Sequence, residues 1–270
     1  MKKAWLFIAL VFVAFSLNAQ KSGDRDWEIG VNSGISWYNG DLNPTKFFGS
    51  DYYHQAIGVS LRKNLNRRFA LRGQFIYGRL SANDQASKSS FQLNRNLNFS
   101  TPIYELSSTI EFNFLEYDPL IRKYQFSPYS FIGLSIFRFN PETEIEGSVY
   151  ELQPLATEGK SYSLVSVSIP FGFGFKWAIS DRLLFSADWG MRRSFTDYLD
   201  DVSQSYPLKG ELTGLSENIS DRSLEQSGPD GTNWGTQRGN SQTKDWYSFV
   251  MAGLSFRIGP KKGSCKHIGI

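Results

Sequence analysis

The sequence is poor in the residues that build most metal sites and disulfides. It contains one cysteine, Cys265, and two histidines, His54 and His267. A zinc centre usually needs four such ligands close together, so this set excludes an ordinary zinc site. An intramolecular disulfide framework is excluded as well. Net charge is also low, at +3 over 270 residues. This near-neutral balance argues against a nucleic-acid partner.

Long apolar runs are missing except at the amino terminus. Lys2 and Lys3 precede an apolar run over residues 4–17, and Ala19 stands just before Gln20. This pattern is typical of a secretory signal peptide, predicted as residues 1–19. The run is shorter than the roughly 20 residues of a membrane-spanning helix, and no run of that length follows. Residue 20 is not cysteine, so we expect no lipid anchor.

Aromatic residues and glycine are abundant. Phe, Tyr and Trp make up 16% of the chain, 24 residues are glycine, and the hydrophobic fraction is 40%. Strands that alternate between an apolar and a polar face give such averages. Period-two alternation predicts eight strands. Their expected ranges are 27–38, 54–64, 69–80, 97–114, 127–140, 162–179, 183–195 and 245–258.

The faces of most strands follow from the alternation. Strand 162–179 is the clearest, because Val165, Phe173 and Trp177 share one face while Ser166 and Lys176 share the other. Strand 127–140 is apolar on both faces, so its phase stays ambiguous. Pro102 predicts a bulge in strand 97–114.

The connections alternate in length. Segments 65–68, 115–126 and 180–182 are short or moderate, whereas 39–53, 81–96, 141–161 and 197–244 are long. This asymmetry is typical of outer-membrane barrels, with short periplasmic turns and long outer loops. The predicted fold class is therefore all-β: an eight-stranded antiparallel transmembrane β-barrel over residues 20–258. We expect both termini in the periplasm, with residues 259–270 as a periplasmic tail.

Charged residues are predicted on the inner face of this barrel. An eight-stranded barrel is only wide enough to be filled by side chains. Opposite charges would pair there, because an unpaired buried charge is costly. We interpret them as structural filling, with a conducting or catalytic lining as the alternative. The predicted set is Arg62, Arg72, Glu105, Glu111, Lys176, Asp188 and Arg192.

Signals for chemistry are weak. His54 is the one imidazole in the strands available as a base for a serine hydrolase, and nothing in the sequence places a serine and an acid beside it. Asp197, Asp200 and Asp201 could hold calcium in an outer loop, or form a solvated, salt-bridged loop. Gly172 and Gly174 alternate along a strand, so we interpret them as packing residues. No catalytic residue, metal site or cofactor is predicted.

Cys265 is the one thiol, and it lies in the polar tail. In an oxidising compartment it would stay a free thiol or pair with another chain. The sequence alone leaves both options open.

Several strings resemble the PorG family, the outer-membrane barrel component of the Bacteroidetes type IX secretion system. The resemblance spans nearly the whole chain after residue 19. The strings are residues 95–99 (RNLNF), 111–114 (EFNF), 126–129 (FSPY), 137–141 (FRFNP), 151–155 (ELQPL) with 157–159 (TEG), and 195–203 (FTDYLDDVS).

The resemblance implies a non-enzymatic barrel that tethers a periplasmic lipoprotein ring to the outer membrane and supports protein export. The expected partners are that ring lipoprotein, with a disulfide through Cys265 as one option, and outer-membrane lipids. The alternative is a stand-alone barrel, either a lipid-modifying enzyme or a surface-binding or porin-like protein. The partner-binding residues implied are Cys265, Arg67, Arg68, Asp118, Arg122, Asp181 and Arg182.

Overall fold

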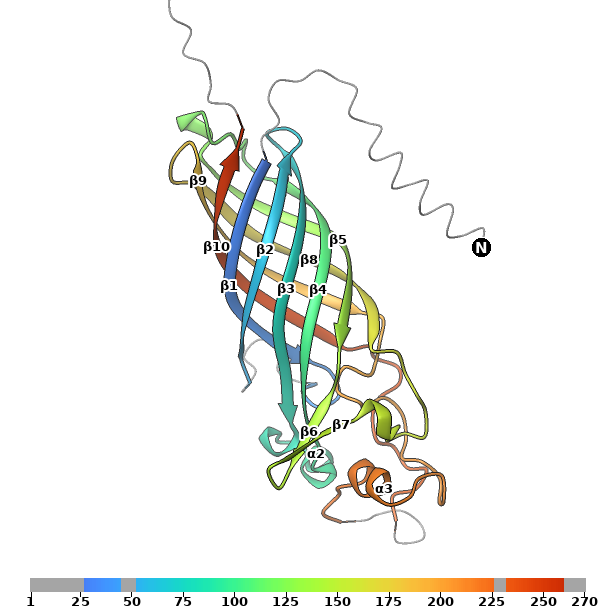
Figure 1. Cartoon of the computed structure of the whole chain (residues 1–270). Helices are drawn as coiled ribbons and strands as arrows, with labels where there is room; N and C mark the ends of the chain where they lie inside the picture. The colour runs from blue at the N-terminus through green and yellow to red at the C-terminus, as the bar shows by residue number, and fades with distance from the viewer. Residues whose placement is uncertain (1–26, 45–51, 226–231, 260–270) are drawn as a thin grey trace, which may run out of the picture.

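The computed structural model describes residues 27–44, 52–225 and 232–259. Eight long antiparallel strands close into a barrel (Figure 1). The predicted signal peptide and nearly all of the predicted tail lie outside the described residues. The barrel strands are β1 (Trp27–Asn39), β2 (His54–Asn64), β3 (Phe69–Asn83), β4 (Asn98–Asn113), β5 (Phe126–Phe139), β8 (Val165–Ala178), β9 (Leu183–Ser194) and β10 (Trp246–Ile258).

The predicted eight-stranded barrel is confirmed, and most strand ends fall within three residues of the predicted ones. The segment expected to be a loop over residues 141–161 contains an additional hairpin of β6 (Glu142–Ile145) and β7 (Ser148–Glu151). Glu146 and Gly147, both with positive φ, form its two-residue turn. Each strand has only four residues, so no alternation was long enough to predict it.

The strand register fixes the geometry of the barrel. A walk from Trp27 through hydrogen-bonded partners round the barrel returns to β1 at Trp37, ten residues further along. Ten residues of rise against eight strand spacings correspond to a strand tilt of about 40°. The partners along this path are Trp27, Lys63, Leu71, Ile110, Ile132, Phe171, Met191, Ser248 and Trp37.

The two ends of the barrel differ (Figure 1). At the turn end lie the three shorter connections, and β1 begins there beside the last residue of β10, with Trp27 opposite Ile258. At the loop end lie the β6–β7 hairpin and two short helices, α2 (Ser90–Arg95) and α3 (Leu215–Ser220). We call the described segments that extend beyond the eight barrel strands at this end the loop-end cap. It also contains 3₁₀ turns at Asp84–Ala86 and Gln153–Leu155.

Side chains alternate between the wall and the bore as predicted. Val165, Phe173 and Trp177 are exposed on the outer wall of β8, and Lys176 is buried inside. The phase of β5, which the sequence left open, places Tyr129 and Phe131 inside and Ile132 outside. Large exposed apolar residues continue over all eight strands. A closed barrel with such a wall is suited to span a bilayer. Among the described residues, no helix is long and apolar enough to cross a membrane.

Glycine makes room for one of the inner aromatic residues. A Cβ on Gly190 would lie 2.6 Å from the Phe131 ring, and one on Gly172 would lie 2.9 Å from it. Gly172 is therefore a packing residue, as the sequence suggested. The expected bulge at Pro102 is wrong, because the register of β4 against β3 continues through Arg79 and Pro102 without an inserted residue. On its other side, β4 pairs with β5 only from Ile103 onward, so the missing N–H of proline breaks no ladder there.

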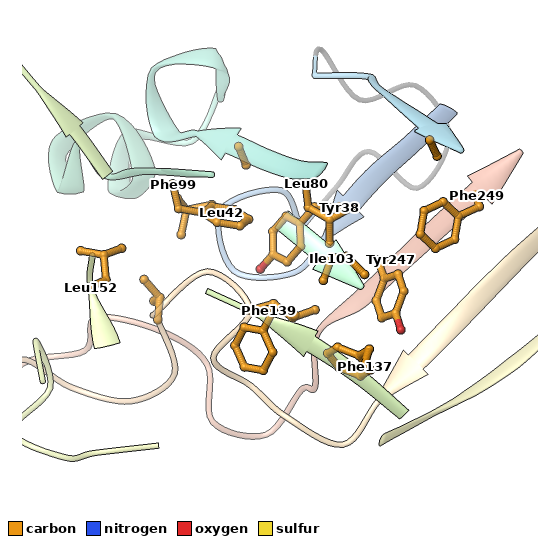
Figure 2. Packing of buried hydrophobic residues seen from close by; sticks show 14 of the residues in the cluster. Tyr38, Leu42, Leu80, Phe99, Ile103, Phe137, Phe139, Leu152, Tyr247 and Phe249 are labelled. Carbon is orange, nitrogen blue, oxygen red and sulfur yellow. The ribbon is translucent and has the colours of Figure 1, made fainter. Parts of the chain in front are cut away.

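A hydrophobic cluster fills the loop half of the bore. Tyr38, Ile103, Phe137 and Tyr247 lie close together in Figure 2, on strands that are far apart in sequence. The rings of Phe137 and Tyr247 meet edge to face at 5.2 Å. Leu152 and Leu199 extend the same cluster into the loop-end cap, so the cap and the barrel share one core.

Candidate functional site

The turn half of the bore contains a buried network of ion pairs. Glu111 is its central carboxylate. It lies 2.9 Å from Nε of Arg62, 3.1 Å from Nε of Arg72 and 3.0 Å from Nζ of Lys176. Arg62 also pairs with Glu28 at 2.8 Å, and Arg72 pairs with Asp188 at 2.6 Å. Three cations thus face three carboxylates, so this network is formally neutral.

Aromatic rings complete the network. The hydroxyl of Tyr129 donates to Asp188 at 2.8 Å. Lys176 Nζ lies 5.1 Å from the centre of the Tyr129 ring and 4.8 Å from that of Tyr117. Every charged member of the network is nearly inaccessible to solvent, with Glu111 at 0% and Arg72 at 3% exposure. Dense pairing of this kind offsets the cost of removing the charges from water.

Two of the predicted inner charges form a separate pair nearer the loop end. Arg192 contacts Glu105, with Nε 3.3 Å from Oε2. The hydroxyl of Tyr247 donates to the same Oε2 atom at 2.8 Å. The structure thus places all seven predicted residues in the bore, but in two groups. Sequence reasoning did not single out Glu28, Tyr129 or Tyr247, although Glu28 occupies an inward position of the first predicted strand.

Those predicted partner-binding residues that the structure describes gather at the turn end. Arg67 Nη1 lies 3.2 Å from Glu116, and Arg67 Nε lies 3.6 Å from Asp118. Arg68 Nη1 donates to the Phe114 carbonyl at 2.5 Å. The β2–β3 turn and the β4–β5 connection are therefore fixed to each other.

Three other predicted partner-binding residues, Arg122, Asp181 and Arg182, are exposed around this pair of connections. Arg122 opens a 3₁₀ turn, Arg122–Tyr124, within the β4–β5 connection. Asp181 and Arg182 form the β8–β9 turn, where the backbone N–H of Arg257 donates to the Arg182 carbonyl at 2.8 Å. Cys265 lies outside the described residues. We call the set Arg67, Arg68, Asp118, Arg122, Asp181 and Arg182 the turn-end surface.

The acidic segment of the loop-end cap is buried and satisfied by protein donors. Asp197 accepts from Ser203 Oγ at 2.6 Å, and Asp201 accepts from the Tyr162 hydroxyl at 2.6 Å and from Thr157. Burial raises the pKa of Asp201 to about 6 despite the nearby Arg238 guanidinium. Within the described part of the chain, no group of three or more His, Cys, Asp or Glu residues is arranged to hold a metal ion.

Two other carboxylates of the cap share one hydroxyl. Tyr38 Oη lies 2.6 Å from Asp200 Oδ2 and 2.8 Å from Asp245 Oδ1, and its single proton can serve only one of them at a time. Burial, together with the neighbouring acids, raises the pKa of Asp200 well above its usual value. The pKa of Asp245 is raised in the same direction, first by burial. This part of the cap therefore favours protonated carboxyls.

His54 has a serine neighbour that the sequence did not indicate. Its Nε2 atom lies 2.6 Å from Ser81 Oγ. None of the described hydrogen bonds or ion pairs joins a carboxylate to His54. A serine hydrolase needs an acid to orient the histidine and stabilise its charged form. Within the described residues, the pair is therefore not part of a triad.

Comparisons with known proteins give the following likenesses. Among solved structures, the attachment invasion locus protein Ail of Yersinia pestis is 11% identical, with a TM-score of 0.43, covering 87% of this chain and 99% of that one. Neisserial surface protein A is 11% identical, with a TM-score of 0.43 and coverages of 85% and 96%. OprG from Pseudomonas aeruginosa is 10% identical, with a TM-score of 0.44 and coverages of 88% and 97%.

None of the curated proteins matches the chain in sequence. A family model does match. Its description is "Domain of unknown function (DUF6089)", and the match covers residues 2–216, which is most of the chain. The chain therefore belongs to the DUF6089 family.

Proposed function

We propose that the protein is a non-enzymatic, non-conducting anchor in a Gram-negative outer membrane, which holds a periplasmic ring of the type IX secretion machinery. The observation that carries this proposal is the filled bore. The ion-pair network occupies its turn half and the hydrophobic cluster its loop half. A barrel filled in this way offers neither a water-filled path nor an accessible catalytic pocket inside. Its function then depends on its outer surfaces.

The turn-end surface is suited to bind a protein. Its connections are held together by the Arg67 pairs with Glu116 and Asp118 and by the bond from Arg68 to the Phe114 carbonyl. A partner would therefore meet a pre-ordered surface and lose little loop entropy on binding. Arg122 and Arg182 remain exposed there for polar contacts. On this proposal the turn end and both termini face the periplasm.

The resemblance to the PorG family supports the choice of partner, a ring-forming periplasmic lipoprotein. Cys265 would lie on the same side of the membrane. Lys261, Lys262 and Lys266 stand close to it in sequence, and positive charge favours the thiolate that disulfide exchange requires. A disulfide to the lipoprotein would add a covalent link to the non-covalent contact.

Co-purification from outer membranes in mild detergent tests the anchoring role. We expect the ring lipoprotein to accompany the wild-type barrel, and the double variant Arg122→Glu/Arg182→Glu to lose it. Lys88→Glu, an exposed basic residue at the loop end, is the matched control and should retain it. Retention by the double variant, or an equal loss in the control, would count against the turn-end surface. Heat-dependent migration on gels checks that each barrel is folded.

Non-reducing gels test the covalent link separately. We expect a band of higher mass that collapses with reductant and is missing from Cys265→Ser. Wild-type protein that migrates as a monomer in both conditions would show that the tail makes at most a non-covalent contact.

A pocket in the loop-end cap favours a second candidate, a surface-binding barrel. The pocket has a volume of about 500 Å³ and is lined by Phe91 and Trp246 together with Asn39, Asn240 and Lys88, among others. Mixed aromatic and amide linings suit small polar ligands. If the Trp246→Ala variant still co-purifies with the ring lipoprotein but no longer binds a surface ligand, this result would favour the second role.

A further inference from the structure

The charges on the outer wall of the barrel are all of one sign. Outward positions on the eight described barrel strands include four charged residues, and each is basic. Lys63 lies at the turn end, where its Nζ is 4.8 Å from the centre of the Trp27 ring. Arg79, Arg138 and Arg193 lie on β3, β5 and β9 and are exposed. The inner wall, in contrast, has both acids and bases, such as Glu111 and Arg62.

The three arginines lie at one depth. Trp27 begins β1 and Trp37 lies two residues before its end. Ten residues of rise at a tilt of about 40° place the two about 25 Å apart along the barrel axis. This is the height of the apolar band of a membrane barrel. When the same register is followed round the wall, Arg79, Arg138 and Arg193 all fall about 25 Å above Trp27. They therefore border the bilayer at the loop end.

Aromatic residues surround the arginines at this level. Arg138 is directly opposite Tyr104, whose ring lies 5.1 Å from that of Tyr77. Arg193 is directly opposite Trp246. Tyrosine and tryptophan prefer the depth of the lipid headgroups, which agrees with the depth derived from the register.

None of the three guanidinium groups has an ion-pair partner among the described residues. The guanidinium of Arg79 donates to the neutral hydroxyl of Ser100 at 3.1 Å. No contact with an acid within 4 Å is present for Arg138 or Arg193 in the described part of the chain. Guanidinium groups bind phosphate oxygens through two parallel hydrogen bonds, and they are weakly hydrated compared with ammonium groups.

The spacing suits phosphates in a row. In the strand order β3-β4-β5-β8-β9, the arginines occupy every second strand. Two strand spacings are about 10 Å, and the register offsets Arg138 by two residues from Arg79 and Arg193 by four residues from Arg138. Neighbouring arginines therefore lie about 12 and about 16 Å apart along the wall, so each can contact the phosphate of a separate headgroup. On the remaining three strands, no outward charge lies at this depth within the described residues, so the positive charge covers one side of the barrel only.

We propose that Arg79, Arg138 and Arg193 form a binding surface for phosphate-bearing lipid headgroups in the leaflet at the loop end. The occupant is a membrane lipid, because the residues are on the wall that faces lipid and at headgroup depth. This inference is independent of the periplasmic partner and would hold for a stand-alone barrel as well.

Binding of bisphosphorylated lipid A to the purified full chain in phosphatidylcholine nanodiscs tests the proposal. Quenching of tryptophan fluorescence by a spin-labelled lipid A reports on Trp246, which is beside Arg193. We expect the double variant Arg138→Gln/Arg193→Gln to bind about tenfold more weakly than the wild type. Lysine at both positions should give an intermediate loss, because the charge remains and the paired hydrogen bonds do not.

Lys63→Gln is the matched control, since it removes the one outward charge that the described barrel strands carry near the opposite end. We expect it to bind like the wild type. Equal binding by the wild type and the double variant, or an equal loss in Lys63→Gln, would overturn the proposal. Full displacement of the lipid by inorganic phosphate would also overturn it, because the site would then recognise the free anion rather than a headgroup held at the membrane surface. Heat-dependent migration confirms that each variant is folded.

Discussion

Arg62 and Glu111 are 49 residues apart in the sequence, yet their side chains meet in the bore with Nε and Oε2 2.9 Å apart. The contact depends on two strand pairings, β2 with β3 and β3 with β4. Glu111 also contacts Arg72 and Lys176, so this single carboxylate faces three cations.

Replacing Glu111 by Gln should therefore destabilise the barrel by about 3–5 kcal/mol, since it leaves buried cations without compensation. Urea unfolding in lipid vesicles, followed by tryptophan fluorescence, measures the change. Glu144→Gln, in the exposed part of the β6–β7 hairpin, is the control and should change stability by about 0.5 kcal/mol or less. A similarly small effect of Glu111→Gln would mean that water reaches the network.

The stability of the loop-end cap should fall as the pH rises. Burial raises the pKa of Asp201 from 3.8 to about 6. The folded cap thus binds this proton more tightly than the unfolded chain does. The resulting stabilisation is complete below about pH 4 and is lost as the pH rises through about 6, with a magnitude on the order of 3 kcal/mol. The pKa of Asp41 is raised to about 6 and acts in the same direction.

Hydrogen exchange of the backbone amides over residues 199–203, corrected for the intrinsic effect of pH, measures this change. We expect faster exchange at about pH 8 than at about pH 5. Asp201→Asn should reduce the difference, and asparagine tolerates the positive φ of 65° at this position. Asp181→Asn, exposed at the turn end, should leave the difference unchanged. Protection that increases with pH would contradict the prediction.

A substitution at Phe173 tests which face of β8 is in contact with lipid. It is 58% exposed, and its ring meets that of Trp189 edge to face at 5.1 Å. Its register position places it near the middle of the apolar band. Phe173→Arg should therefore destabilise the barrel by about 2–4 kcal/mol in lipid vesicles. Val149→Arg, exposed on the β6–β7 hairpin, should have little effect. An equally small effect at Phe173 would place this wall away from the lipid.

Much of the fold could be predicted because alternation is a local signal. Each strand shows which of its side chains face the bore, so residues such as Arg72 and Lys176 could be assigned to the bore without any partner. Which charges pair depends on the register between strands, and this is why Glu105 and Arg192 form their own pair. His54 and Ser81 meet for the same reason, and Ser81 lay just past the predicted end of its strand.

The phase of β5 could not be predicted, because both of its faces are apolar. It is decided by glycines on other strands, since Gly172 and Gly190 leave the space that Phe131 occupies. The sequence also did not predict the folded structure of the loop-end cap. Its contacts, such as those of Asp201 with Thr157 and Tyr162, join segments about 40 residues apart, and no periodic pattern marks them.

The barrel should not conduct ions, because more than one group of side chains fills the bore. Planar-bilayer recordings of the purified wild type should show no stepwise currents. The double variant Glu105→Gln/Arg192→Gln removes the pair nearer the loop end but leaves the network around Glu111 and the hydrophobic cluster in place. It should also remain silent, because the replacement side chains still fill most of the same space.

A barrel of eight strands has room for little more than its own side chains, so a conducting path requires that the network around Glu111 also be open. Stepwise currents in the wild type would show that the filling is not tight, and would favour the porin-like alternative over an anchor. Currents in the double variant alone would show that the pair of Glu105 and Arg192 closes the bore by itself.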